Sequence, residues 1–396
     1  MTLTLLLDLD DTLLNTNLEA FVPAYFQALA QEFAPYIAPD LMVRALLSGL
    51  RKMNENEDFS KILQDVFDEE FYSQVGVSRK KLQAVADHYY DHVFPALAGL
   101  TTQNPQAKLF VDWALSQGYR IAIATDPLFP RKATYHRLRW AGFEPEQFEL
   151  ISTPDRFHFT KSHPAYYAEI LGRMGWPEGP VLMVGNDMER DIRPAQMLGL
   201  ATYHVDEEPA SSFEPETGAH GKLADLRRWL ESTNFEALTP SFKSRDSILG
   251  IAASTPAALN GLLSGLNMAA WSNEPTPEDW AMIEIICHLR DTEREIYPMQ
   301  IKLFKDQNEP FIPRPDTGVW ASHRHYLHED GISALQEFND ARRETLALLK
   351  TVAAEDWKMK ARHAIFGPTT FREVVGFMAE HDRLHIQQAW SALKKL

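Results

Sequence analysis

The chain has 396 residues, enough for two ordinary domains, and its 45% hydrophobic and 24% charged residues are typical of a folded globular protein. Its 39 Lys and Arg against 55 Asp and Glu give a net charge of -16, which argues against nucleic acid and anionic membranes as partners. Cys287 is the only cysteine, and we expect a cytoplasmic protein with no disulfide, no export signal and no membrane span.

The first half of the chain alternates between strand and helix patterns. An apolar run at residues 3–7 predicts a buried strand, and apolar residues then recur at helical spacing from residue 18 to about residue 53, with helical patterning to about residue 90. Further strands and helices are predicted to alternate: strands at residues 119–125, 181–185 and 201–205, and helices at residues 106–117, 164–174 and 191–198. This alternation predicts an α/β domain with a parallel sheet, whose ligands bind at the carboxyl ends of the strands.

The character of the chain changes after about residue 230. Residues 231–245 are polar, contain Pro240 and lack periodicity, so we interpret them as a linker. Beyond it the pattern predicts an all-α four-helix bundle over residues 246–396, with no strands. Its helices are expected at residues 248–268, 277–304, 332–352 and 370–393.

Polar side chains with complementary chemistry follow the predicted strands. Asp8 and Asp10 stand at i and i+2 where the first strand ends, so that one carboxylate can attack phosphorus while the other donates a proton to the leaving oxygen. Thr125 ends the next strand, and the Thr125 hydroxyl and the Lys161 ammonium suit the oxygens of a phosphoryl group. Together these residues predict phosphoryl transfer.

A third group of acidic residues follows the strand at residues 181–185. Asp187 lies in the loop after Gly185-Asn186 and is expected to join Asp8 around a hard cation, with Asp191 four residues on. Each motif alone is also compatible with a turn, a helix cap or a surface charge. Their order, each after a predicted strand, favours a site.

With these motifs in order, residues 1–230 resemble the haloacid dehalogenase superfamily of α/β Rossmann-like hydrolases. The resemblance implies that Asp8 is the nucleophile, that Asp10 is the acid/base, and that Asp8, Asp187 and the Asp10 carbonyl hold Mg²⁺ with support from Asp191. It also implies a helical cap at about residues 14–93. Because dehalogenation needs no proton donor, Asp10 favours a phosphatase that acts on a small phosphorylated metabolite through an aspartyl-phosphate. Asp126 departs from the family, in which Asn is common at this place.

Three histidines of the predicted bundle form a second candidate site. His381 and His385 stand at i and i+4 on one face of the last helix, and His288 on the second helix is placed to meet them in the bundle interior. Ordinary core or surface histidines are the alternative interpretation. Cys287 is one residue from His288 and points about 100° away along the helix, so it is not expected to be a nucleophile.

The bundle resembles the DinB/YfiT-like family, on the motifs Cys287-His288-Leu289-Arg290-Asp291 and His381-Asp382-Arg383-Leu384-His385. The resemblance implies a divalent transition metal, for which Zn²⁺, Ni²⁺ and Fe²⁺ are open choices. Two alternatives remain for this domain. In the first, the bundle is a metal-dependent thiol transferase. In the second, it is a non-catalytic module through which the chain forms a homodimer.

Overall fold

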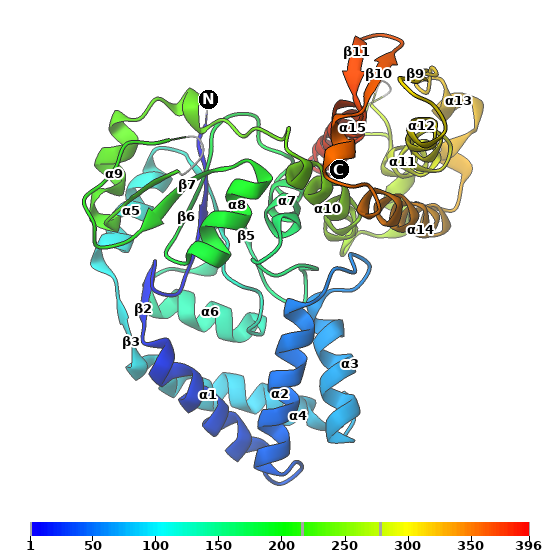
Figure 1. Cartoon of the computed structure of the whole chain (residues 1–396). Coiled ribbons are helices and arrows are strands. Elements are labelled where there is room, and N and C mark those ends of the chain that lie inside the picture. The colour runs from blue at the N-terminus through cyan, green and yellow to red at the C-terminus, as the bar shows by residue number, and fades with distance from the viewer. Residues whose placement is uncertain (1, 215–217, 277–278, 396) are drawn as a thin grey trace. The chain divides into compact units, whose positions relative to one another are not determined.

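A computed structural model describes residues 2–214, 218–276 and 279–395 of the chain (Figure 1). They form two compact units. The first comprises the residues up to Ile170 together with Pro177–Pro240, and the second comprises Leu171–Trp176 and the residues from Ser241 onward. None of the helices within the described ranges has the length and apolar character that crossing a lipid bilayer requires.

The first unit is built on a six-stranded sheet in the order β5-β4-β1-β6-β7-β8, and all of its strand pairs are parallel. This confirms the predicted α/β class. The strands are β1 (Thr4–Leu7), β4 (Arg120–Ile123), β5 (Leu150–Ile151), β6 (Val181–Gly185), β7 (Ala201–Val205) and β8 (Ala219–Gly221). The helices α5 (Pro105–Ser116), α6 (Arg131–Trp140), α7 (Pro164–Arg173) and α8 (Arg193–Leu198) lie between these strands in the chain, and α9 (Leu223–Ser232) follows the last one.

The register of β1 against its two neighbours decides which loops meet. Leu7 is paired with Ile123 of β4 and with Val184 of β6. The backbone N–H of Asp8 donates to the Val184 carbonyl at 3.0 Å, and that of Ala124 donates to the Leu7 carbonyl at 2.8 Å. The residues directly after β1, β4 and β6 therefore come together at one edge of the sheet.

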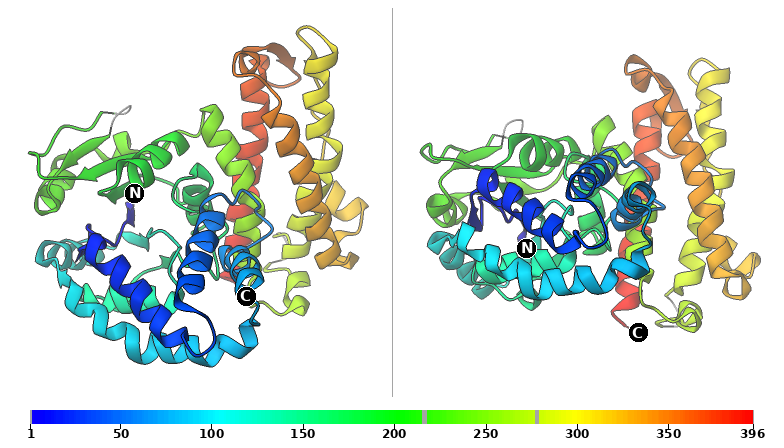
Figure 2. Two further views of the ribbon diagram at one scale, coloured as in Figure 1. Left: turned by 60° about the horizontal axis from the view of Figure 1, so that its bottom comes forward. Right: turned by 90° about the horizontal axis from the view of Figure 1, so that it is seen from below.

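A helical insertion leaves the sheet unit after β1 and returns to it before α5. The strands β2 (Leu14–Thr16) and β3 (Thr101–Gln103) pair antiparallel at its base, so the segment departs and returns at the same place. Its helices gather on one side of the sheet (Figures 1 and 2) around a core of their own. They are α1 (Leu18–Phe33), α2 (Pro39–Asn54), α3 (Leu63–Val75) and α4 (Arg79–His88).

The segment from residue 18 to residue 53, where a helical pattern was expected, forms two helices, α1 and α2. The second begins with Pro39 in its first turn, where the missing proline N–H costs no hydrogen bond. The helix expected at residues 191–198 also differs, because a turn of π-helix, Met188–Ile192, precedes α8.

The second unit is the predicted helical bundle, and its long helices run side by side in Figure 2. Helix α11 packs against α14, and α10 packs against α15. The helices are α10 (Arg245–Leu263), α11 (Met282–Glu295), α12 (Tyr297–Asp306), α13 (Trp320–His323), α14 (Gly331–Lys350) and α15 (Phe371–Leu393). The second predicted helix is divided into α11 and α12, with a proline in the first turn of α12, because proline cannot donate the hydrogen bond that a continuous helix needs.

The expectation that the bundle has no strands is wrong. A three-stranded sheet in the order β11-β10-β9 is formed by β9 (Phe311–Ile312), β10 (Lys360–His363) and β11 (Gly367–Thr370). Strands of two to four residues are too short to produce a recognisable alternation in the sequence.

Candidate functional site

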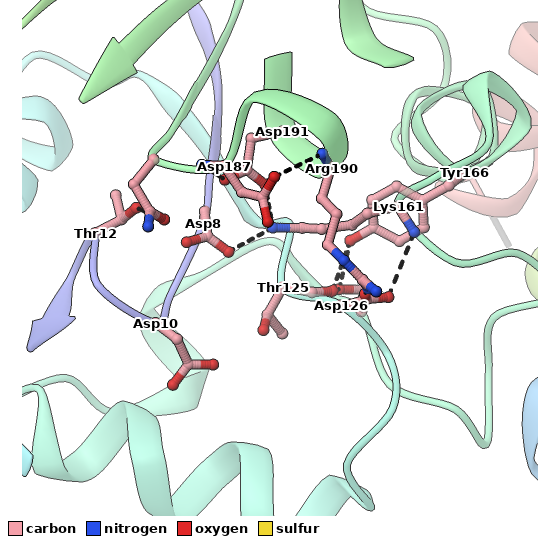
Figure 3. A network of polar contacts seen from close by, with 12 residues as sticks. Asp8, Asp10, Thr12, Thr125, Asp126, Lys161, Tyr166, Asp187, Arg190 and Asp191 are labelled. Carbon is pink, nitrogen blue, oxygen red and sulfur yellow. Dashed lines mark hydrogen bonds and ion pairs between the residues drawn. The ribbon is translucent and has the colours of Figure 1, made fainter. Parts of the chain in front are cut away.

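Lys161 lies between two of the predicted site carboxylates (Figure 3). Its Nζ donates to Asp8 Oδ1, and to Asp191 Oδ1 at 2.5 Å. All three side chains are buried. Burial opposes the charge of Lys161, but the carboxylates of Asp191 and Asp8 outweigh it and raise the Lys161 pKa. One buried cation thus joins residues from three different loops.

Burial and the nearby charge of Asp191 raise the pKa of Asp8 to about 7, although Lys161 acts in the opposite direction. Burial away from water is the largest cause, and the second is that two carboxylates share one ammonium. A raised pKa is typical of a carboxylate placed for chemistry or for a cation rather than for stability.

Asp191 is fixed in place by its surroundings. Its Oδ2 accepts a hydrogen bond from the backbone N–H of Asp187 at 3.0 Å. Gly185 makes this possible, because a Cβ at that position would collide with the Asp191 carboxylate. The sequence assigned Asp191 a supporting role, and the structure gives it contacts that hold both Lys161 and the loop after β6.

The carboxylate of Asp187 is exposed and caps the helical turn that follows it. Its Oδ1 accepts from the backbone N–H groups of Glu189 at 2.8 Å and Arg190 at 3.1 Å. The place beside Asp8 belongs to the preceding residue, Asn186. The end of the Asn186 side chain lies 3.3 Å from Asp8 Oδ2 and 3.1 Å from the Asp10 carbonyl oxygen.

Asn186 was not expected from the sequence. Its amide end also lies 3.2 Å from Thr12 Oγ1, and with its nitrogen turned toward these oxygens the amide donates to all of them. Only its position directly after a buried strand, next to a glycine, pointed to it. The adjacent Asp187 was preferred from the sequence because a carboxylate is a common ligand of hard cations.

The Asp10 carboxylate has partners of its own. Its Oδ1 accepts from Thr16 Oγ1 at 3.0 Å, and its Oδ2 accepts from Arg137 Nη1. Arg137 is 1% exposed, and its Nε and Nη2 have no hydrogen-bond partner within the described ranges. The carboxylate thus has other partners than the Asp10 carbonyl, which faces Asn186. Neither Arg137 nor Thr16 was expected from the sequence.

Thr125 and Asp126 lie in the loop after β4. The buried Thr125 carbonyl accepts from Tyr166 Oη at 2.8 Å, which anchors the loop to α7. Asp126 forms an ion pair with Arg190, and its Oδ1 accepts from the backbone N–H of Lys161 at 3.4 Å. The extra negative charge at position 126 is therefore balanced by an arginine.

In the second unit, His288, His381 and His385 converge as predicted, with ligand atoms all within 4.8 Å of one another. His381 Nε2 lies 3.0 Å from His288 Nε2 and 3.1 Å from His385 Nε2. Burial lowers the pKa of all three, that of His288 to about 3. Among the described residues this is the only group of three or more His, Cys, Asp or Glu side chains gathered closely enough to share an ion.

Two of the three outer nitrogens of this histidine cluster are oriented by neighbours. His381 Nδ1 lies 2.9 Å from Tyr297 Oη, and His385 Nδ1 lies 3.0 Å from Gln388 Oε1. Trp280 stacks on His385 with ring centroids 5.7 Å apart. Partners of this kind fix the orientation and tautomer of metal-binding imidazoles.

With this geometry in place, comparison with known proteins defines the family. Residues 2–199 match the model of the haloacid dehalogenase-like hydrolases. The chain belongs to this family. Residues 252–389 match the DinB superfamily, so this hydrolase carries a DinB-like bundle at its other end.

Individual relatives of this haloacid dehalogenase-like hydrolase are distant. The uncharacterized protein YuaE of Bacillus subtilis is 22% identical over 145 residues, which cover 34% of the chain and 90% of YuaE. A HAD phosphatase from Thermococcus onnurineus is 19% identical, covers 58% of the chain and 98% of its own length, and has a TM-score of 0.38. YfiT from Bacillus subtilis, a four-helix bundle, is 18% identical over 39% of the chain and 89% of YfiT, with a TM-score of 0.35.

Proposed function

We propose that the haloacid dehalogenase-like unit is a Mg²⁺-dependent phosphatase that acts on a small phosphorylated metabolite through an aspartyl-phosphate on Asp8. The observation that supports the proposal is that two neighbouring carboxylates have different surroundings. Asp8 is buried against Lys161, whereas Asp10, two residues on, is held by Thr16 and Arg137. Phosphoryl transfer needs one carboxylate as nucleophile and a second for the proton.

The reaction proposed here has two balanced steps. An Asp8 carboxylate oxygen attacks phosphorus, the bond to the ester oxygen breaks, and the leaving alcohol takes a proton from Asp10. Asp10 then removes a proton from water, and the water oxygen attacks the phosphorus of the aspartyl-phosphate. The bond between the Asp8 oxygen and phosphorus breaks, which releases phosphate and restores the Asp8 carboxylate. In this proposal Lys161 and Thr125 stabilise the charge on the transferring oxygens.

The residues around Asp8 fit a hard cation. Asp8 Oδ2 and the Asp10 carbonyl both lie next to the Asn186 side chain. If the amide turns over, its oxygen joins the other two as a third ligand, and oxygen ligands are what Mg²⁺ prefers. We therefore propose Asp8, Asp10 and Asn186 as the cation ligands, with Asp191 in support and Asp187 as the alternative from the sequence. The ion would neutralise the phosphate dianion beside the carboxylates.

The test is hydrolysis of a panel of phosphate monoesters with Mg²⁺ and with chelator. We expect Mg²⁺-dependent release of phosphate. The rate of release should fall by at least about 10³-fold in Asp8→Asn and in Asp10→Asn. Asp11→Asn is the matched control from the same loop, because Asn can still accept the hydrogen bond that Asp11 Oδ1 receives from the Thr16 N–H. Full activity of Asp8→Asn would exclude the mechanism.

For the bundle we propose a divalent transition metal bound by His288, His381 and His385, with Zn²⁺, Ni²⁺ and Fe²⁺ as candidates. The convergence of the three imidazoles, two of them held from behind by Tyr297 and Gln388, supports this proposal. Three protein ligands leave a coordination position for water or a thiol, as in a catalytic site. A dimerisation module is the alternative, and metal analysis with sedimentation of the native protein separates the two.

A further inference from the structure

The helical insertion borders an open pocket of about 430 Å³. Its walls come from the helices α1 to α4 (Figure 1) and from two loops of the sheet unit, residues 128–132 after β4 and residues 154–155 after β5. We call it the apolar pocket. Because both loops follow the carboxyl ends of parallel strands, the pocket lies on the side of the sheet where the candidate site is built.

Most of the wall is aromatic or aliphatic. Side chains of this kind from the insertion line it, among them Phe26, Leu29, Leu46, Leu50 and Phe67, together with Phe129 from the loop after β4. The hydroxyls of the lining Tyr25 and Tyr90 lie 2.8 Å apart and bond to each other. Such a surface binds apolar groups, because water leaves it readily.

Every charged side chain that lines the apolar pocket has an ion-pair partner. Asp68 pairs with Arg79 at 2.5 Å, Lys132 pairs with Asp87 at 2.9 Å, and Arg131 pairs with Asp155. A second phosphate, a carboxylate or an ammonium on a ligand would compete with these ion pairs. One acceptor is left, the buried Asp155 Oδ1, which has no hydrogen-bond partner in the described part of the chain and suits a neutral hydroxyl or amide.

Phe129 connects the apolar pocket to the acid/base carboxylate. The guanidinium of Arg137 stacks on its ring at 4.2 Å from the centroid, and the same guanidinium donates to Asp10. The Phe129 ring also packs against Tyr25 of the pocket wall, with ring centroids 5.2 Å apart. The acid/base carboxylate is thus linked to this wall through Arg137 and Phe129, which is the side from which a leaving alcohol would take the proton of Asp10.

We infer that the substrates are phosphate monoesters of uncharged, mainly apolar alcohols or phenols, whose hydrocarbon part occupies the apolar pocket. This inference rests on the proposed phosphatase function. The reaction is the hydrolysis of R–O–PO₃²⁻ to R–OH and phosphate, in which only the phosphoryl group carries charge. Sugar phosphates, nucleotides and phosphorylated carboxylic acids are poor substrates on this view, because the pocket offers them no free charge and few hydrogen bonds.

The test is a series of n-alkyl phosphates from methyl to octyl with phenyl and 1-naphthyl phosphate, alongside glucose 6-phosphate, AMP and 3-phosphoglycerate. We expect kcat/KM to rise by about fourfold per added methylene until the pocket is filled, since that is the gain from burying one methylene. The three polar phosphates should fall at least about tenfold below octyl phosphate. Phosphatase activity without dependence on chain length overturns this inference alone, whereas no turnover of any phosphate overturns the proposed function as well.

A pair of leucine variants on α2 tests whether the hydrocarbon part of the substrate binds in the apolar pocket. Leu50 lines the apolar pocket, whereas Leu47, three residues earlier, is 52% exposed and does not line it. Leu50→Glu should reduce the ratio of kcat/KM for octyl over methyl phosphate by at least about tenfold, because it places an unpaired charge in the wall. Leu47→Glu should keep the ratio. Thermal unfolding of both variants shows whether they are folded, and an equal loss in the two would place the hydrocarbon elsewhere.

Discussion

Arg137 and Asp10 form an ion pair in the first unit, in which a buried guanidinium nitrogen donates to the carboxylate proposed as acid and base. The guanidinium also stacks on Phe129, so its position is fixed by packing as well as by charge. A buried arginine with unsatisfied N–H groups is costly for stability. Its presence here therefore points to a positioning role for Arg137 in catalysis.

Replacing this arginine tests that role. Arg137→Met should lower kcat by about 10- to 100-fold with a smaller change in KM, because the Asp10 carboxylate loses its fixed orientation. Arg137→Lys should restore part of kcat, since a cation returns without the stacking plane. Arg139→Met is the control on the same helix, where the arginine is exposed and pairs with Glu144. If Arg137→Met and Arg139→Met have equal kcat, the ion pair has no role in the reaction.

Removing the charge of Asp8 should stabilise the metal-free protein. The Asp8 pKa is about 7 in the folded state, against an ordinary value of 3.8, so the folded state binds more protons than the unfolded state between these values. The free energy of unfolding therefore falls as pH rises through this window.

Asp8→Asn escapes this loss, so its melting temperature should exceed that of the wild type by an increasing margin from pH 5 to pH 8 in chelator. At pH 8 we expect the free energy of unfolding of Asp8→Asn to exceed that of the wild type by about 2 kcal/mol. This is roughly half of the free energy that corresponds to a pKa shift of this size, because the variant also weakens the contact with Lys161. Scanning calorimetry measures the margin. A margin that stays constant with pH would contradict the raised pKa.

Substitutions at Asn186 and Asp187 separate the two assignments of the cation ligand. Asn186→Ala should raise the Mg²⁺ concentration needed for half-maximal activity by about tenfold or more, because it removes the side chain next to Asp8 Oδ2. Asp187→Ala should cost about 1 kcal/mol of stability through loss of the helix cap and change the Mg²⁺ requirement less. The reverse order would favour Asp187 as the ligand, as the sequence suggested.

Metal binding by the bundle should appear as a thermal shift. Zn²⁺ at about 100 times its dissociation constant stabilises the folded state by about 2.7 kcal/mol, and a chelator should reverse the effect. His381→Ala should abolish the shift, because the His381 imidazole lies between the other two. The control is His323→Ala, since His323 is exposed and outside the cluster. A shift of equal size in both variants would show that the ion binds elsewhere.

Cys287 should be inert to alkylation in the folded protein. The side chain is fully buried, and burial raises the pKa of its thiol to about 12, so almost no thiolate is present at pH 8. We expect iodoacetamide to label Cys287 only after unfolding in guanidinium chloride, as measured by intact mass. Rapid labelling of the native protein would mean that α11 opens readily and that Cys287 has to be reconsidered as a nucleophile.

Much of the site could be predicted because its parts are local in sequence. Asp8 follows a run of four buried strand residues, and His381 and His385 share a helix face by their spacing alone. Strand ends and helix faces follow from the periods of 2 and 3.6 residues, which a single sequence displays.

Other parts were decided only by the tertiary structure. Arg137 lies 127 positions from Asp10, and the two meet because α6 packs near the loop after β1. The place of Asn186, rather than Asp187, beside Asp8 follows from the register between β1 and β6, which no local pattern encodes. The apolar pocket likewise forms from helices and loops that come together only on folding, so the sequence indicated the chemistry and the fold decided which groups surround it.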